Sequence, residues 1–168
     1  MTKNSPNITD LIYRSLIFDY KIYKIVKDKG EYTRYCLLIV IIAALASGIS
    51  TAHFTSNISL IKQPVYSIIG WVVRSGIIYL IGVYILGYRS SISGVVRTLG
   101  LSYSPQILNL FAIIPFIGLN VFLISVIWLF FTTVFAVKQT FDCSRIMSLI
   151  ITISGLFPYV VIMFFVIR

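Results

Sequence analysis

Long apolar stretches alternate with short polar connections along this chain of 168 residues. An α-helix needs about 20 apolar residues to cross about 30 Å of hydrocarbon, and four of the stretches approach that length. The pattern predicts an all-α membrane protein with five transmembrane helices. The expected spans lie at about residues 35–52, 65–88, 103–115, 116–137 and 146–167. We expect a flexible tail at residues 1–7 and a single membrane domain over residues 8–168.

The third apolar stretch leaves the number of helices open at one place. Pro105 to Val137 is 33 residues, too long for one comfortable span and short for two. The Pro115–Gly118 segment favours a tight outer turn between a short helix and a full one. A helix of about a dozen residues covers only about 18–20 Å, so it would be tilted, buried or re-entrant. The alternative is one long kinked helix, which would move Lys138 and Arg145 to the outside.

Before the first span, apolar residues recur every three or four positions from Ile8. This period predicts an amphipathic helix over residues 8–29, with basic and aromatic flanks that are typical of a segment in the lipid headgroup layer. The alternative is a helix packed on a partner or on the protein's own loops. A second short interfacial helix is predicted over residues 89–100. The residues expected at the lipid interface are Leu16, Tyr20, Lys21, Tyr23, Lys24 and Lys27.

Composition and charge fix the class and the orientation. Hydrophobic residues make up 58% of the chain and charged residues 11%, which excludes an ordinary soluble domain. With five crossings, one side collects Lys3, Arg14, Lys21, Lys24, Lys27, Lys29, Arg34, Arg89, Arg97, Lys138 and Arg145. The other side collects only Lys62 and Arg168. Because loops rich in Lys and Arg stay cytoplasmic, we expect the N-terminus inside and the C-terminus outside. The net charge of +9 then points to anionic headgroups rather than to nucleic acid.

Arg74 is the polar residue with the strongest claim to a function within a span. It lies about nine residues into the second span, where a cation costs at least about 2.5 kcal/mol. No predicted span contains an acidic residue to pair with it. Its side chain either snorkels to the outer interface or faces a polar interior made by neighbouring helices. A structural role is favoured over a substrate site, because a working site needs convergent partners.

Catalytic chemistry has little support in the sequence. There is no nucleophile elbow, zinc-protease motif, phosphate-binding glycine loop or Cys/His cluster. The single histidine, His53, has no orienting carboxylate nearby, so a catalytic triad is not expected. Cys36 and Cys143 are expected to be ordinary apolar thiols. We therefore expect no enzyme activity, no metal and no cofactor.

The order of elements resembles a known family. An amphipathic N-terminal helix and five spans accompany a Leu-Gly-x-Ser-x-x-Pro run and an Ile-Pro-x-Ile-Gly turn. The residues that carry the motif are Arg97, Gly100, Ser102, Pro105, Pro115 and Gly118. The chain resembles the bacterial branch of the Yip-one family, integral membrane proteins first named as interactors of Ypt/Rab GTPases. It lacks a proline near Phe18 and the acidic segment linked to GTPase binding, so the resemblance implies the topology but not GTPase binding.

Two functions follow from these features. The first is a non-enzymatic scaffold that organises the membrane or binds a membrane-protein partner or a second copy. The alternative is a small transporter or channel component that uses Arg74 and the helix breaks at Pro105, Pro115 and Pro158. The resemblance and the charge pattern imply a multi-pass protein of a bacterial inner membrane.

Overall fold

The computed structural model describes residues 6–54 and 59–167, and the regular elements in these two ranges are helices. The α-helices are α1 (Ile8–Leu16), α2 (Tyr20–Asp28), α3 (Thr33–Phe54), α4 (Ser59–Tyr79), α5 (Ile92–Ser102), α6 (Gly118–Phe141) and α7 (Arg145–Ile167). A π-helix, η2 (Leu80–Ile85), continues α4. The 3₁₀-helices are η1 (Gly30–Tyr32) and η3 (Ser104–Ile113).

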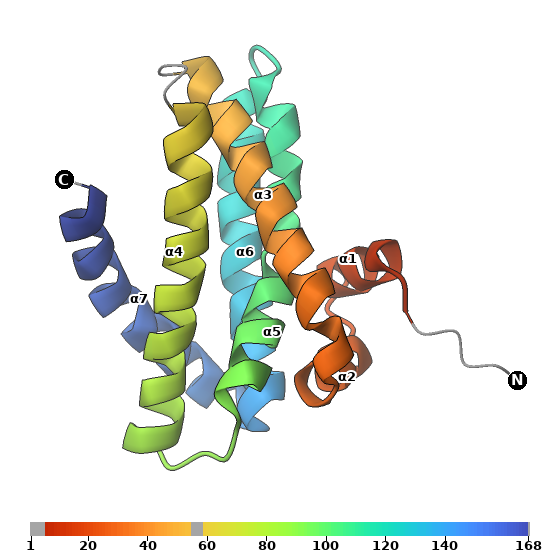
Figure 1. Ribbon diagram of the computed structural model, residues 1–168, viewed down its shortest axis with the longest axis vertical. Helices are drawn as coiled ribbons and strands as arrows, with labels where there is room; N and C mark the ends of the chain where they lie inside the picture. The colour runs from red at the N-terminus through yellow and green to blue at the C-terminus, as the bar shows by residue number, and fades with distance from the viewer. Residues whose placement is uncertain (1–5, 55–58, 168) are drawn as a thin grey trace, which may run out of the picture.

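The helices run back and forth between the two ends of an elongated bundle (Figure 1). Helix α3 runs away from α2, α4 returns, and α5 with η3 makes the next passage. Helix α6 then returns, and α7 runs back along the outside of the bundle. The α4–α5 and α6–α7 connections therefore lie at the same end as α2, at the bottom of Figure 1.

Three segments of the described chain are long and apolar enough to cross a membrane: Gly30–Ala52, Ile61–Ile85 and Gly118–Phe141. They overlap the predicted spans at 35–52, 65–88 and 116–137, which supports an integral membrane protein. The segment Arg145–Pro158 of α7 is a shorter apolar helix. The connection between α3 and α4 is shorter than the polar stretch at 53–64 suggests, because α3 continues to Phe54 and α4 begins at Ser59.

The short third helix predicted at residues 103–115 is the 3₁₀-helix η3, which has Pro105 in its first turn. A 3₁₀-helix rises about 2 Å per residue, so these 10 residues cover about 20 Å. The chain then turns at residues 114–117, where Phe116 adopts φ 68°, and α6 begins at Gly118. The turn predicted at Pro115 is therefore present, and the alternative of one long kinked helix is wrong.

The single helix predicted over residues 8–29 is instead a hairpin of α1 and α2. Between them Phe18 adopts φ 58°, and the Asp19 carboxylate caps α2 by accepting from the Lys21 backbone N–H at 2.9 Å. The ring of Phe18 meets Phe135 of α6 edge to face, 5.7 Å between centroids. An aspartate at an N-cap and this ring contact explain why the helix breaks here.

The hairpin packs along the side of the bundle, in contact with the protein's own helices. The indole N–H of Trp128 donates to the Leu16 carbonyl at the α1–α2 turn, and Trp128 lies near the middle of α6. Leu11, Ile22 and Tyr23 are fully buried. The prediction that Tyr23 faces lipid is therefore wrong, and the alternative of packing on the protein's own elements describes this face.

The short helix predicted over residues 89–100 is present as α5, which begins at Ile92 and packs inside the bundle rather than on its surface. Most of its residues from Gly94 to Ser102 are buried, and it contacts α2, α3, α4 and α6. Ser91 caps it by accepting from the Gly94 backbone N–H. A β-carbon on Gly100 would press on Cys36 and Trp71, so glycine here permits close approach of α3 and α4.

Candidate functional site

A polar cavity of about 360 Å³ lies between the helices of the bundle. Its lining residues come from five elements and the residue after α5: Ser47, Thr51, Gln63, Ser67, Arg74, Tyr103, Gln106, Phe122, Val126, Leu129, Phe130 and Leu156. The polar lining comes mainly from α3, α4 and η3, whereas α6 and α7 supply apolar groups. The cavity thus combines one cation with amides and hydroxyls inside an apolar bundle.

Arg74 is the only charged residue of this lining, and it is 6% exposed. Its Nε–H has no hydrogen-bond partner among the residues that the structure describes. The Arg74 side chain is buried among the helices, where it lines the cavity together with hydroxyls and amides. A buried guanidinium with an unsatisfied donor is costly, and it favours an anion or a polar acceptor in the cavity.

Beside the cavity, an amide–hydroxyl cluster joins α3, η3 and α6, and its members Ser47 and Gln106 also line the cavity. Asn109 donates from Nδ2 to Gln106 Oε1 at 2.8 Å and to Ser47 Oγ at 2.9 Å. The Ser125 hydroxyl of α6 donates to Asn109 Oδ1, and Asn109 is fully buried. Fully paired polar groups of this kind hold neighbouring helices at fixed positions in a membrane.

The sequence contains one local signal for this cluster. Gln106 and Asn109 are three residues apart in an otherwise apolar stretch, and amides in such a stretch are expected to find polar partners. Ser47 and Ser125 carry no comparable signal, because a serine hydroxyl can satisfy itself on its own helix backbone.

Replacing Arg74 by methionine is expected to raise the free energy of unfolding by about 2 kcal/mol, because it removes a buried charge without a described partner and keeps the side-chain volume. Thermal unfolding of the purified protein in one detergent measures the change. Arg74→Lys is the control, since it keeps a buried cation and should bring no gain. A lower unfolding temperature for R74M would mean that the guanidinium is satisfied inside the cavity.

The N-terminal hairpin is fastened to the bundle by Arg97, a residue of the family-like motif. Arg97 is buried in α5 and donates from Nε to the Val26 carbonyl at 2.8 Å and from Nη2 to the Lys27 carbonyl at 2.5 Å. These carbonyls lie in the last turn of α2, where a helix leaves its acceptors unpaired. A cation at this end also complements the helix dipole.

Asp142 fastens the same helix from the α6–α7 connection. It forms ion pairs with Lys24 at 3.2 Å and Lys27 at 3.0 Å. Burial alone would raise the pKa of Asp142, but the hydrogen bonds and charges of the two lysines outweigh it and hold the pKa below its usual value. Both lysines, which the sequence predicts at the lipid interface, are thus engaged with a carboxylate of the protein.

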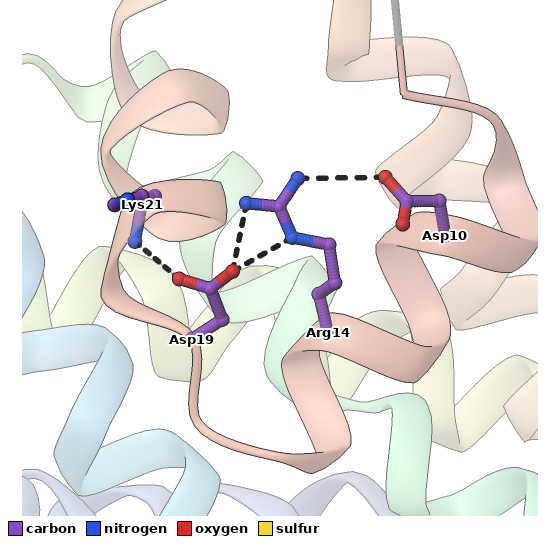
Figure 2. A network of polar contacts seen from close by, with 4 residues as sticks. All are labelled: Asp10, Arg14, Asp19 and Lys21. Atoms are coloured by element: carbon purple, nitrogen blue, oxygen red, sulfur yellow. Dashed lines mark hydrogen bonds and ion pairs between the residues drawn. The ribbon is translucent and has the colours of Figure 1, made fainter.

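A second charged network lies in the hairpin itself (Figure 2). Arg14 donates from Nε to Asp19 at 2.7 Å and approaches Asp10 at 3.5 Å. The three side chains are partly exposed. The neighbouring Leu16 carbonyl is bonded to Trp128, about 15–20 Å from either end of α6. Phe18, which precedes Asp19, contacts Phe135, so the turn beside the network lies about 9–20 Å from the C-terminal end of α6, within the length of a candidate membrane span.

Comparison with known proteins gives a family. The Yip1 domain family matches residues 25–167, which is most of the chain. The chain belongs to the Yip1 family. No match was found among curated proteins or among solved structures.

In this Yip1 family protein the motif residues lie at the junctions between helices. Gly100, Ser102 and Pro105 are buried where α5 meets η3, and the Ser102 hydroxyl donates to the Leu99 carbonyl. Pro115 lies exposed in the turn before α6, and Gly118 is buried at the start of that helix. Of the residues expected at the interface, Leu16 is half-buried and Tyr20 and Lys21 are exposed. Within the described ranges, no three His, Cys, Asp or Glu side chains form a group suited to a metal ion.

Proposed function

We propose that this Yip1 family protein is a non-enzymatic scaffold of the membrane. It binds a second membrane protein, or a second copy of itself, through the outer face of the α1–α2 hairpin. The hairpin suits this role because Arg97 and Asp142 hold it on the bundle as a preformed surface. A preformed surface binds a partner at a lower entropic cost than a flexible segment.

The proposal rests on the depth of the Asp10–Arg14–Asp19 network. Partly exposed charges within the length of a span are poorly solvated by lipid tails, even when they are paired with each other. A neighbouring polypeptide that supplies polar groups would relieve this cost. The exposed Tyr13 and Ile17 beside the network add apolar and aromatic surface of the kind that anchors interfaces.

A photoreactive phenylalanine analogue at Tyr13 tests the scaffold. Tyr13 is 63% exposed on the hairpin, and the control position Val72 is 54% exposed on α4, which α1 does not appreciably contact. We expect irradiation of intact membranes to give protein adducts from position 13 and lipid adducts alone from position 72. The mass of the adduct separates a second copy from a different protein. Identical lipid-only products at both positions would contradict the scaffold.

We further propose five crossings of a bacterial inner membrane, with the N-terminus in the cytoplasm and the C-terminus outside. Support comes from the shared end of the bundle that carries α2 and the α4–α5 and α6–α7 connections. These segments and the helix ends beside them include Lys24, Lys27, Lys29, Arg89, Lys138 and Arg145. That end would meet the anionic headgroups of the inner leaflet. Reporters fused after Arg168, one active only outside and one fluorescent only inside, test the orientation. An inside C-terminus would reject five crossings.

The cavity around Arg74 favours a second candidate, a small transporter or channel component for anions. A buried guanidinium whose Nε–H has no partner in the described ranges, and which lies among hydroxyls and amides, is suited to bind an anion within a span. Pro105 begins η3, Pro115 lies in the turn before α6 and Pro158 lies inside α7, but none of the three lines the cavity. Anion flux into proteoliposomes should fall in Arg74→Gln. Equal flux in the wild type and R74Q would reject this candidate.

A further inference from the structure

A groove at the cation-rich end of the bundle lies between α6, α7 and the α1–α2 turn. We call it the α6–α7 groove. Its apolar half, about 470 Å³, is lined by Phe18, Phe131, Val134, Phe135, Lys138, Arg145 and Ser148. Its polar half, about 480 Å³, is lined by Phe18, Tyr20, Lys24, Phe135, Lys138, Gln139, Asp142, Cys143 and Arg145. The two halves adjoin, because both contain Phe18, Phe135, Lys138 and Arg145.

The groove has an excess of positive charge. Lys138 and Arg145 form no ion pair within the described part of the chain. Asp142 is the carboxylate of the lining, and Lys24 and Lys27 already engage it. Two cations are therefore free to bind an anion.

The start of α7 adds to this positive field. The helix begins at Arg145, and the Ser144 hydroxyl caps it by accepting from the Met147 backbone N–H at 3.2 Å. The remaining amides of the first turn and the helix dipole favour an anion at this position. Arg145 thus stands at the positive end of a helix 23 residues long.

Along α6 the groove changes from polar to apolar, as a membrane lipid does from its headgroup to its acyl chains. Lys138 lies three residues from the end of α6, and Phe131 lies seven residues further in, about 10 Å along the helix. Phe131 is exposed and Val134 is half-buried, so they offer an apolar track toward the middle of the bundle. A small free anion would use the cations but not this track.

We propose that the α6–α7 groove binds one glycerophospholipid with an anionic headgroup. Its phosphate lies between Lys138 and Arg145, and one acyl chain follows Phe131 and Val134. The aromatic ring of Phe18, held by the left-handed turn, closes the side of the groove toward the hairpin. This site is independent of the partner surface on the outer face of the hairpin and of the cavity around Arg74.

Native mass spectrometry tests the proposal on the full chain in a mild detergent. The protein is incubated with equal amounts of phosphatidylglycerol and phosphatidylcholine that carry the same acyl chains. We expect one phosphatidylglycerol to be retained in preference to phosphatidylcholine. The double variant Lys138→Gln, Arg145→Gln should reduce its retention roughly tenfold or more, because each cation near an anionic headgroup contributes to binding. The matched control Lys21→Gln, Lys29→Gln removes two exposed cations outside the groove and should retain the lipid.

A second variant and a soluble competitor make the test decisive. Val134→Trp fills the apolar half without changing charge, and it should lower retention even if the double glutamine variant fails to fold. Equal retention of both lipids, or equal loss in the control, would overturn the proposal. Complete displacement of the lipid by an equal concentration of glycerol phosphate would also overturn it, because a free-anion site does not need the acyl chain.

Discussion

Replacing Tyr23 by serine is expected to lower the free energy of unfolding by about 3–5 kcal/mol, because a fully buried aromatic ring is lost and a cavity remains. The ring meets Phe135 of α6 edge to face, with 5.4 Å between centroids, so the loss also weakens the joint between the hairpin and the bundle. Thermal or denaturant unfolding in a single detergent measures the change. Unfolding should begin with release of α2.

Tyr20 provides the matched control, three residues earlier in the same helix. It is 52% exposed, whereas Tyr23 is 0% exposed, so Tyr20→Ser should change the free energy of unfolding by no more than about 0.5 kcal/mol. Tyr23→Phe keeps the ring and should retain most of the stability. Similar small effects of Y20S and Y23S would mean that both rings face lipid, as the amphipathic pattern alone predicts.

Replacing Arg97 by leucine is expected to cost about 3–4 kcal/mol, because the Val26 and Lys27 carbonyls lose their donors inside the protein. The side chain is 7% exposed, so water does not readily replace it. The consequence should be local, since Arg97 joins α5 to the end of α2. Hydrogen exchange of the α2 amides should accelerate strongly, while the amides in the middle of α6 stay protected.

Arg97→Lys separates charge from geometry. Lysine keeps the cation at the end of α2 but lacks the planar fork that reaches both carbonyls, so protection of α2 should be intermediate. Unchanged exchange in Arg97→Leu would mean that the ion pairs of Lys24 and Lys27 with Asp142 hold the hairpin without help.

The membrane helices are predictable from the sequence because the length of an apolar stretch is a local property. The stretch at 116–137 corresponds to α6, and Pro105 and Pro115 mark the start of η3 and the turn that follows it. The 3₁₀ form of η3 is not predictable in this way. The side chains of Gln106 and Asn109 in η3 share hydrogen bonds with Ser47 and Ser125, which belong to distant parts of the chain and give no local signal.

The amphipathic pattern of the hairpin predicts contact with lipid for a face that packs on protein. An amphipathic helix with basic flanks presents the same sequence whether its apolar face meets lipid or protein. Tyr23 is buried because Phe135 lies against it, and nothing near Tyr23 in the sequence indicates that contact. The cavity around Arg74 is a related case. The sequence shows that a cation in this span is costly, but it does not show that Ser47, Gln63 and Gln106 line the same cavity as Arg74.

The contacts of the hairpin also set an order for biosynthesis. Lys27 and its partner Asp142 are 115 positions apart, and the ribosome adds about 5–20 residues per second. The binding site for the hairpin on α6 is therefore completed about 6–23 s after α2 has been made. During that interval the apolar faces of α1 and α2 lack their binding site on α6, and the membrane interface is the apolar environment available to them. The amphipathic pattern therefore suits two environments in turn. It suits the headgroup layer before α6 has been made, and it suits the surface of α6 in the folded protein.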